Sequence, residues 1–426
     1  MSSTNASPTL VINDRVKALW EEGKDVLHLG FGESRFPVHP LIKSALIDAA
    51  SNRSYLPSSG TEKLKKIVAD YYAKKLNVSL NPNQILIGIG SKSLLFSMIH
   101  AIDGDILLPK PSWVSYSSIA KLTGKKITRF DLDRDHGFRL SIDSVISGYD
   151  SAKSSGQNPK MVVLNSPNNP VGNSFSNSDL ETVSNWARKK NITILSDEIY
   201  GLVTHNGNKH QSIFEFYPER TIVFSGLSKH LSLGGYRIGI AIVPNNEFGT
   251  ELASQFNAIA GSIWSCVPAP FQAMAETAFA HDDEIENYIQ TCTKIHGTRT
   301  HYVYHGLKEM NLECPKPSGG FYVYASYKNF EGALKNLGIE SCKDLAEYLL
   351  GNFEIATLPG VAFGDDSKNL CLRISTSYLD METDEKAQHI LDTFMSGIEP
   401  ITFMKDHHPQ TNLFLKRMND FLSSLN

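Results

Sequence analysis

The chain has 426 residues, of which 41% are hydrophobic and 20% charged, and this composition is that of an ordinary globular protein. Its formal net charge of -4 provides no general electrostatic attraction to nucleic acid or to an anionic membrane. No stretch approaches the roughly 20 apolar residues that cross a bilayer, and the N-terminus lacks a basic segment followed by an apolar run, so we expect a cytoplasmic protein without nucleic-acid or membrane partners.

The cysteines lie apart from one another in the sequence, and none forms a C-x-x-C pair. Their spacing predicts neither a zinc site nor a disulfide framework, so we expect no metal in the protein. Free cysteines also fit a reducing compartment. The five residues are Cys266, Cys292, Cys314, Cys342 and Cys371.

Helices and strands alternate over the first three quarters of the chain. Apolar residues recur at helical spacing in residues 61–76, 93–102 and 180–190. Between these segments lie short apolar runs bounded by turn residues, which predict strands. Such alternation indicates a mostly parallel sheet covered by helices on both faces, so we predict a large three-layer α/β domain over residues 50–315. The predicted strands are residues 84–90, 105–109, 160–167, 192–198, 221–226 and 237–244.

A different pattern begins after the proline- and glycine-rich residues 315–320. Apolar runs and two helices, the second over residues 385–398, predict a smaller α+β domain formed by residues 1–49 together with 316–426. Residues 411–426 place apolar side chains on one stripe of a helix and predict a C-terminal helical extension that packs against the body of the protein. The stripe consists of Phe414, Met418, Phe421, Leu422 and Leu425.

Polar residues follow several predicted strands, at the edge of the sheet where α/β proteins bind ligands. Asp197 and Glu198 come directly after one apolar strand, and "LNSPNNPVG" follows another. Gly90, Ser91 and Lys92 are expected to open the helix at 93–102, whose free N–H groups and positive dipole end favour a phosphate.

The stretch "SGLSKHLSLGGYRIG" places Lys229 in a turn of small residues after a strand, with Arg237 eight positions later. A lysine in this place is a candidate nucleophile. Asp197 can hold a pyridine nitrogen protonated, Trp113 can stack on a flat ring, and Arg237 and Lys92 can neutralise a phosphate. Together these groups suit pyridoxal 5'-phosphate.

The segments Gly226-Leu227-Ser228-Lys229 and Arg237-Ile238-Gly239 match the cofactor-attachment motif of a known family. From "LGFGESRFP" to "CLRIS" the chain resembles the class I/II aminotransferases, which are fold-type I pyridoxal-phosphate enzymes. The resemblance implies an aminotransferase that moves an amino group between an L-amino acid and a 2-oxo acid through an imine on Lys229.

The resemblance also implies the roles of individual site residues. Asp197 pairs with the ring nitrogen of the cofactor, and Tyr200 and Asn169 contact its 3′ oxygen. Trp113 stacks on the ring. The phosphate is held by Ser91, Lys92, Ser228 and Arg237.

The substrate site and the oligomeric state follow from the same resemblance. Arg373 in "CLRIS" pairs with the α-carboxylate of the substrate, near Asn169 and a backbone group of Gly32. Tyr55 in "YLPSSG" matches a tyrosine that reaches the phosphate in the neighbouring subunit, so we expect a homodimer with shared active sites.

The chain departs from the family at several positions. Where many members read G-E-P-D-F, residues 32–36 read "GESRF", so the resemblance does not establish a side-chain preference for the substrate. Arg35 is either a surface charge or a substrate contact. Gly226 replaces a serine found in several branches, and Ser225 is a candidate substitute at the phosphate. For three aromatic residues two interpretations stay open: they line a pocket for an apolar or aromatic substrate side chain, or they belong to the core. These residues are Phe31, Phe36 and Trp264.

Two other functions use the same scaffold. A carbon–sulfur lyase or another enzyme of β- or γ-elimination, or a cyclase, needs the same early residues, because the orientation above the ring decides the reaction. A non-catalytic regulator that binds the cofactor is less consistent with the sequence, since Lys229 is present and no helix-turn-helix segment precedes the domain. The identity of the amino acid and of the oxo acid stays open.

Overall fold

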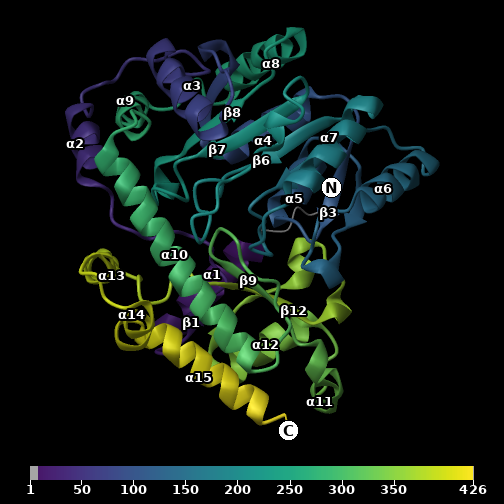
Figure 1. Ribbon diagram of the computed structural model, residues 1–426, viewed down its shortest axis with the longest axis vertical. Coiled ribbons are helices and arrows are strands. Elements are labelled where there is room, and N and C mark those ends of the chain that lie inside the picture. The colour runs from purple at the N-terminus through teal and green to yellow at the C-terminus, as the bar shows by residue number, and fades with distance from the viewer. Residues whose placement is uncertain (1–7, 426) are drawn as a thin grey trace.

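The computed structural model describes residues 8–425 and contains a seven-stranded central sheet (Figure 1). The strands follow the spatial order β2-β8-β7-β6-β5-β3-β4. β8 is antiparallel to both of its neighbours, whereas the other neighbouring pairs are parallel. The mostly parallel sheet expected from the sequence is therefore confirmed. Its strands are β2 (Ile85–Ile89), β3 (Asp105–Lys110), β4 (Ile127–Asp131), β5 (Pro159–Asn165), β6 (Thr193–Asp197), β7 (Thr221–Gly226) and β8 (Ile238–Ile242).

Each face of this sheet is covered by its own helices. In β5, Met161 and Val163 pack with α4, α5 and α8, whereas Val162 and Leu164 pack with α6 and α7 on the opposite face. α3 and α9 cover the β2–β8 end of that second face. The period-two alternation thus produces the predicted three layers. The covering helices are α3 (Glu62–Leu76), α4 (Gly90–Ala101), α5 (Val114–Leu122), α6 (Ile142–Ser154), α7 (Asn177–Lys190), α8 (Glu247–Ile263) and α9 (Ala269–Ala278).

Hydrogen-bonding side chains define where α7 begins and ends. The hydroxyl of Ser176 accepts a hydrogen bond from the backbone N–H of Asp179, and Asn191 closes the helix in the left-handed conformation, at φ 54°. Basic residues 188–190 occupy the last turn, where they complement the helix dipole. Apolar spacing alone indicated only residues 180–190, because the capping turn at the N-terminus carries no apolar period.

Strand β4 was not predicted from the sequence. It lies at the edge of the sheet and reads "ITRFD", in which only Phe130 is buried. An edge strand with one buried side chain lacks both the continuous apolar run and the regular alternation that identify strands.

The segment after residue 315 forms a three-stranded sheet of its own and pairs with the segment before residue 50 in a two-stranded sheet. β1 (Leu27–His28) pairs in parallel with β10 (Ile355–Ala356). The antiparallel order β11-β12-β9 joins β11 (Leu358–Pro359), β12 (Cys371–Ser375) and β9 (Tyr322–Ser326). These pairings support the proposed division into residues 50–315 and residues 1–49 with 316–426, which stays a prediction.

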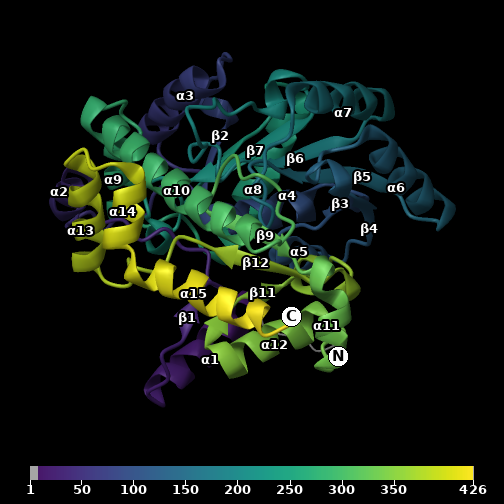
Figure 2. The same cartoon turned by 60° about the horizontal axis from the view of Figure 1, so that its bottom comes forward.

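The long helix α10 (Asp283–Glu309) extends from the helices beside the large sheet to the smaller sheets, and α15 (Pro409–Ser423) lies beside it (Figures 1 and 2). Phe414, Met418, Phe421 and Leu422 of α15 are buried in one cluster with side chains of α10 and α12. The predicted packing of the C-terminal extension is confirmed. The remaining helices are α1 (Pro8–Glu21), α2 (Pro40–Asp48), α11 (Glu331–Asn336), α12 (Cys342–Phe353), α13 (Asp384–Met395) and α14 (Pro400–His407).

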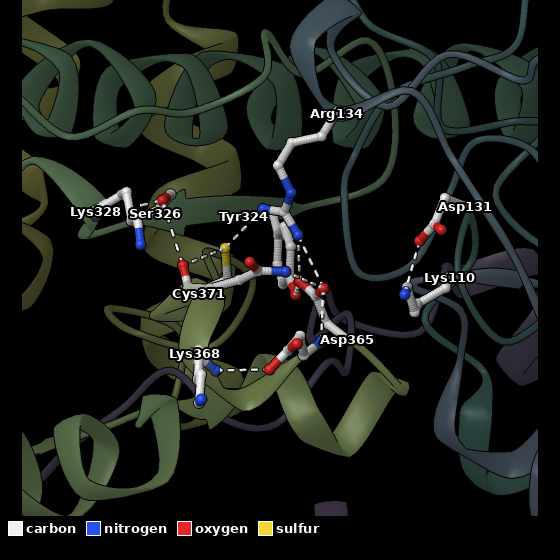
Figure 3. A network of polar contacts seen from close by, with 11 residues as sticks. Lys110, Asp131, Arg134, Tyr324, Ser326, Lys328, Asp365, Lys368 and Cys371 are labelled. Carbon is white, nitrogen blue, oxygen red and sulfur yellow. Dashed lines mark hydrogen bonds and ion pairs between the residues drawn. The ribbon is translucent and has the colours of Figure 1, made fainter. Parts of the chain in front are cut away.

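The buried carboxylate of Asp365 connects the turn after the edge strand β4 to the three-stranded sheet (Figure 3). Arg134, just after β4, donates hydrogen bonds to both carboxylate oxygens of Asp365, at 2.8 and 2.7 Å. Tyr324 of β9 adds a hydrogen bond of 2.6 Å to the same group. Although burial acts in the opposite direction, these hydrogen bonds lower the pKa of the Asp365 carboxyl, so it stays ionised.

Candidate active site

A cavity of about 330 Å³ lies at the carboxyl ends of strands β5, β6 and β7. This is the edge of the sheet at which open α/β proteins bind ligands. Of the residues predicted for the site, all except Tyr55 line the cavity. They are Gly32, Ser91, Lys92, Trp113, Asn169, Asp197, Tyr200, Ser228, Lys229, Arg237 and Arg373.

One end of the cavity carries two cationic side chains beside a helix N-terminus. α4 begins at Gly90, so Gly90, Ser91 and Lys92 open this helix as expected, and Ser91 and Lys92 of its first turn line the cavity. A side chain at Gly90 would place its Cβ 2.1 Å from Nη2 of Arg237, so only glycine admits the guanidinium beside the helix N-terminus. Within residues 8–425, neither Arg237 nor Lys92 has an acidic partner, and burial followed by the charge of Arg237 lowers the pKa of Lys92.

Arg237 adopts a backbone conformation that is rare outside glycine, with φ 56°. Its carbonyl accepts a hydrogen bond from the N–H of Gly90 at 2.9 Å, and its guanidinium donates to the carbonyl of Gly234 at 2.8 Å. Such left-handed residues collect at functional sites, where the surroundings offset the conformational cost. The geometry therefore fixes the arginine at the start of α4.

The Lys229 amine lies inside the cavity and donates a hydrogen bond to the carbonyl of Gly32 at 2.7 Å. Burial lowers the pKa of Lys229 to about 8, and the carboxylate of Glu33 acts in the opposite direction. The amine is therefore neutral in a substantial fraction of molecules near pH 8, as a nucleophile or base requires. Gly32 is itself constrained, because a Cβ there would lie 2.1 Å from the hydroxyl of Tyr322.

The strand before this lysine requires glycine at position 226. A Cβ on Gly226 would lie 2.4 Å from the carbonyl oxygen of Ile238 in the adjacent strand β8. The departure from serine at this position therefore follows from close packing of two backbones. Ser225 does not take over a phosphate contact, since its buried hydroxyl accepts a hydrogen bond from Tyr72 at 2.7 Å and does not line the cavity.

Asp197 ends strand β6 with its carboxylate buried in the cavity wall. Burial raises the pKa of Asp197 to about 6, although a hydrogen bond from the hydroxyl of Tyr116, at 2.6 Å, favours the ionised form. Asn165 joins the two neighbouring loops, because it donates to the carbonyl of Asp197 at 2.8 Å and accepts from the N–H of Asn169 at 2.7 Å.

Sequence reasoning missed Tyr116 and Asn165. Tyr116 lies three residues after Trp113, so the two share a face at the start of α5. Asn165 ends β5, in the polar run that had been noted after that strand. In both cases the signal was present, but no contact could be assigned without coordinates.

Arg373, at the opposite side of the cavity, is a buried cation without a carboxylate partner among the described residues. Its guanidinium donates to Oδ1 of Asn169 at 3.1 Å and to the carbonyl of Gly30 at 2.6 Å. It also lies over the ring of Tyr322, 4.6 Å from the ring centre. Burial lowers the pKa of Arg373, a direction that a bound carboxylate would reverse.

Tyr322 is a further cavity residue that sequence reasoning missed. Its hydroxyl lies 2.7 Å from that of Tyr200. It is the first residue of β9, which pairs with the strand that carries Arg373. Only this strand pairing, which the sequence does not give, brings it to the cavity.

Tyr55 is the predicted site residue that the structure leaves outside the cavity. Its side chain is 88% exposed. Its predicted contact involves a neighbouring subunit, so that contact stays a prediction.

The other open residues lie as follows. Arg35 does not line the cavity; it lies 3.6 Å from the carboxylate of Glu33 and donates to the carbonyl of Glu382 at 3.1 Å. Phe31 lines the cavity, whereas Phe36 and Trp264 pack in hydrophobic clusters. Arg35 therefore ties the cavity wall to the segment before α13.

No helix among residues 8–425 combines the length and the apolar character needed to cross a membrane. Within the same residues, no three side chains of His, Cys, Asp or Glu are grouped so that they can hold a metal ion.

Comparisons with known proteins agree with this geometry. The family described as aminotransferase class I and II matches residues 24–391. The aspartate aminotransferase of Bacillus subtilis (strain 168) is 30% identical over 404 residues, covering 88% of this chain and 94% of that protein. The asparagine–oxo-acid transaminase of Streptococcus mutans is 28% identical over 401 residues, covering 91% of this chain and 96% of that protein.

Solved structures show the same fold. The aromatic aminotransferase from Pyrococcus horikoshii OT3 is 25% identical, with a TM-score of 0.76, and the match covers 90% of this chain and 99% of that one. The expected α/β fold and the expected aminotransferase activity are both confirmed by these matches. The chain belongs to the class I and II aminotransferase family.

Proposed function

We propose that this aminotransferase binds pyridoxal 5'-phosphate in the cavity and holds it through Lys229. One observation carries the proposal: a single cavity contains a buried lysine amine, a carboxylate at a strand end and, at a helix N-terminus, two cations that have no acidic partner among residues 8–425. The unpaired charges of Arg237 and Lys92 fit a phosphate, and the carboxylate of Asp197 fits a protonated ring nitrogen. A cavity of about 330 Å³ lies within the range of small-ligand sites.

When bound, the cofactor supplies an aldehyde that condenses with amines and a ring that accepts the electron pair released at the α-carbon. The protein's own groups then position the ligands and move protons. Ser91, Lys92, Ser228, Arg237 and the N–H groups that follow Gly90 in the first turn of α4 would hold the phosphate, and Trp113 would stack on the ring. Asp197 would keep a proton on the ring nitrogen.

Lys229 is the proposed base. Its amine takes the α-proton of the amino acid, which it can do because burial lowers its pKa to about 8. Tyr200 and Asn169, which line the cavity, would hold the 3′ oxygen of the cofactor. Arg373 binds the substrate α-carboxylate, oriented beforehand by its hydrogen bonds to Asn169 and to the Gly30 carbonyl.

Aspartate and asparagine are the first amino donors to test, because relatives at 28–30% identity are named for them.

Reduction with borohydride tests the attachment. The unmodified protein should retain the cofactor covalently on Lys229, as located by peptide mass spectrometry, and Lys229→Ala should not. Attachment at another lysine would refute the proposal. A screen of amino donors with 2-oxo acids then separates transamination, which releases no ammonia, from elimination.

We also propose a cytoplasmic homodimer in which Tyr55 completes the neighbouring site. An aromatic side chain that is 88% exposed supports a contact outside its own subunit. A mixed dimer of Lys229→Ala and Tyr55→Ala chains, isolated with two tags, should retain about half of the activity if one of its two sites carries both defects. If Tyr55 serves its own subunit, both sites are damaged and activity is nearly lost.

A further inference from the structure

The segment of residues 30–36 runs along the cavity and is held by alternate residues. The carbonyl of Gly30 accepts from Arg373 at 2.6 Å, and that of Gly32 accepts from Lys229 at 2.7 Å. In the proposed function both donors bind ligands: Arg373 binds the substrate carboxylate and Lys229 binds the cofactor. These two hydrogen bonds are therefore not fixed attachments of the segment.

A third attachment involves no ligand-binding group. The hydroxyl of Ser34, which is 2% exposed, lies 2.6 Å from the hydroxyl of Ser232 and 2.9 Å from Nε2 of His296. Ser232 belongs to the turn that follows Lys229, and it also accepts a hydrogen bond from the N–H of Phe36 at 3.2 Å. His296 lies on α10.

The direction of these hydrogen bonds follows from the donors available. Burial, followed by the charge of Arg299, lowers the pKa of His296, so its ring is neutral and carries one proton. Nδ1 has no partner among the described residues, and an unpaired buried N–H costs more than an unpaired acceptor. Nε2–H therefore donates to Ser34, and the Ser34 hydroxyl donates to Ser232.

The imidazole cannot easily turn away from this contact. Its ring lies 4.9 Å from that of Phe36 and 4.8 Å from that of Phe321, measured between ring centres. The side chain is 1% exposed. α10 thus presents a fixed donor to the segment.

We propose that Ser34 is a positioning residue: by linking Ser232 to His296, it holds residues 30–36 so that the Gly32 carbonyl faces the Lys229 amine. The link exists here because residue 34 is a serine, whereas proline at this place has no hydroxyl. It gives a function to one of the chain's departures from the family pattern. The inference rests on the proposed role of Lys229.

The readout is the reactivity of Lys229 in the full-length protein stripped of cofactor. An amine-reactive reagent labels only the neutral amine, so the pH profile of labelling, followed by mass spectrometry, reports the Lys229 pKa. The charged groups that act on this amine are Glu33, Arg373, Asp197 and Arg237. Of these, Glu33 is next to Ser34 and moves with the segment.

Ser34→Ala removes both hydrogen bonds of the link. The midpoint of the labelling profile should fall by about one pH unit, the scale of one hydrogen bond to a charged group, because the Gly32 carbonyl and Glu33 no longer hold the charged amine. Hydrogen exchange of residues 31–36 should increase at the same time.

Two further variants separate this role from a general loss of packing. Ser232→Gly breaks the link from its other end, and glycine suits the left-handed backbone there, at φ 58°, so this variant should fold and show the same shift. Thr300→Val removes a buried hydroxyl pair of 2.7 Å on the same helix α10 and should leave the profile unchanged.

An unchanged midpoint and unchanged exchange in Ser34→Ala or in Ser232→Gly would overturn the proposal, whatever the loss of thermal stability. An equal shift in Thr300→Val would also overturn it. The failure of the proposed function is separate, since it would show as cofactor attached to a lysine other than Lys229 in the unmodified protein.

Discussion

Asp197→Asn should make the cofactor-free protein more stable at neutral pH while it abolishes most of the activity. The side chain ends strand β6 and is 3% exposed, and burial raises its pKa to about 6 from an ordinary value of 3.8. A carboxyl whose pKa is higher in the folded state binds a proton on folding between these values. Its contribution to stability is complete below about pH 4 and is lost as the pH rises through 6.

The size of the effect follows from the same two values. A difference of roughly two pH units corresponds to about 3 kcal/mol, as an order of magnitude. Asparagine nearly preserves the shape, and its Oδ1 can still accept from the N–H of Ile199, now at 3.3 Å. Its Nδ2 can donate to Tyr116, so the substitution mainly removes the charge.

Denaturant unfolding at several pH values measures this prediction. The free energy of unfolding of the variant should exceed that of the unmodified protein by about 2–3 kcal/mol at pH 7, and the difference should vanish near pH 4. Turnover with saturating cofactor should fall by at least a factor of about 100, because a preorganised charge is lost. A stability difference that does not depend on pH would refute the assignment of a buried carboxyl group with a raised pKa at this position.

Three further predictions concern other parts of the chain. Arg373→Lys keeps the charge but cannot reach both Asn169 and the Gly30 carbonyl, so kcat/KM should fall about 100-fold in steady-state assays, and an unchanged value would exclude the fork geometry. Asp365→Asn should lower the free energy of unfolding by about 2 kcal/mol at pH 7, since hydrogen bonds to a charged group are weakened. Because the pKa of Asp365 is lowered, this difference should shrink as the pH falls below its ordinary 3.8, which acid unfolding can check. Gly226→Ser should lower the free energy of unfolding by about 1–3 kcal/mol, because the new side chain contacts the Ile238 carbonyl. A melting temperature equal to that of the unmodified protein would contradict this prediction.

The sequence predicted the large sheet well, because its strands carry strong local signals. Buried parallel strands read as apolar runs, and the polar residues that follow them mark one edge of the sheet. Strand β4 lacked such a run and was missed. The pairing of β1 with β10 joins residues more than 300 positions apart, and no local pattern reports it.

The candidate site divides in the same way. Lys229, Asp197 and Arg237 could be placed from the sequence, because each follows or precedes a strand in a fixed motif. Tyr116 and Tyr322 could not, because the sequence does not give the packing of α5 and the pairing of β9 with β12 that bring these side chains to the cavity.

Residue 34 shows how such packing can turn a sequence departure into a structural feature. Read along the chain, serine in place of proline only removes a conformational restriction, which should loosen the segment. In the structure the same serine has two buried hydrogen-bond partners, from the Lys229 turn and from α10, that lie 198 and 262 positions away. The freedom gained by losing the proline is thus offset by contacts that only the tertiary structure creates. Because these contacts involve no group assigned to cofactor or substrate, the segment has an attachment that does not need to break when Arg373 and Lys229 exchange their carbonyl partners for ligands.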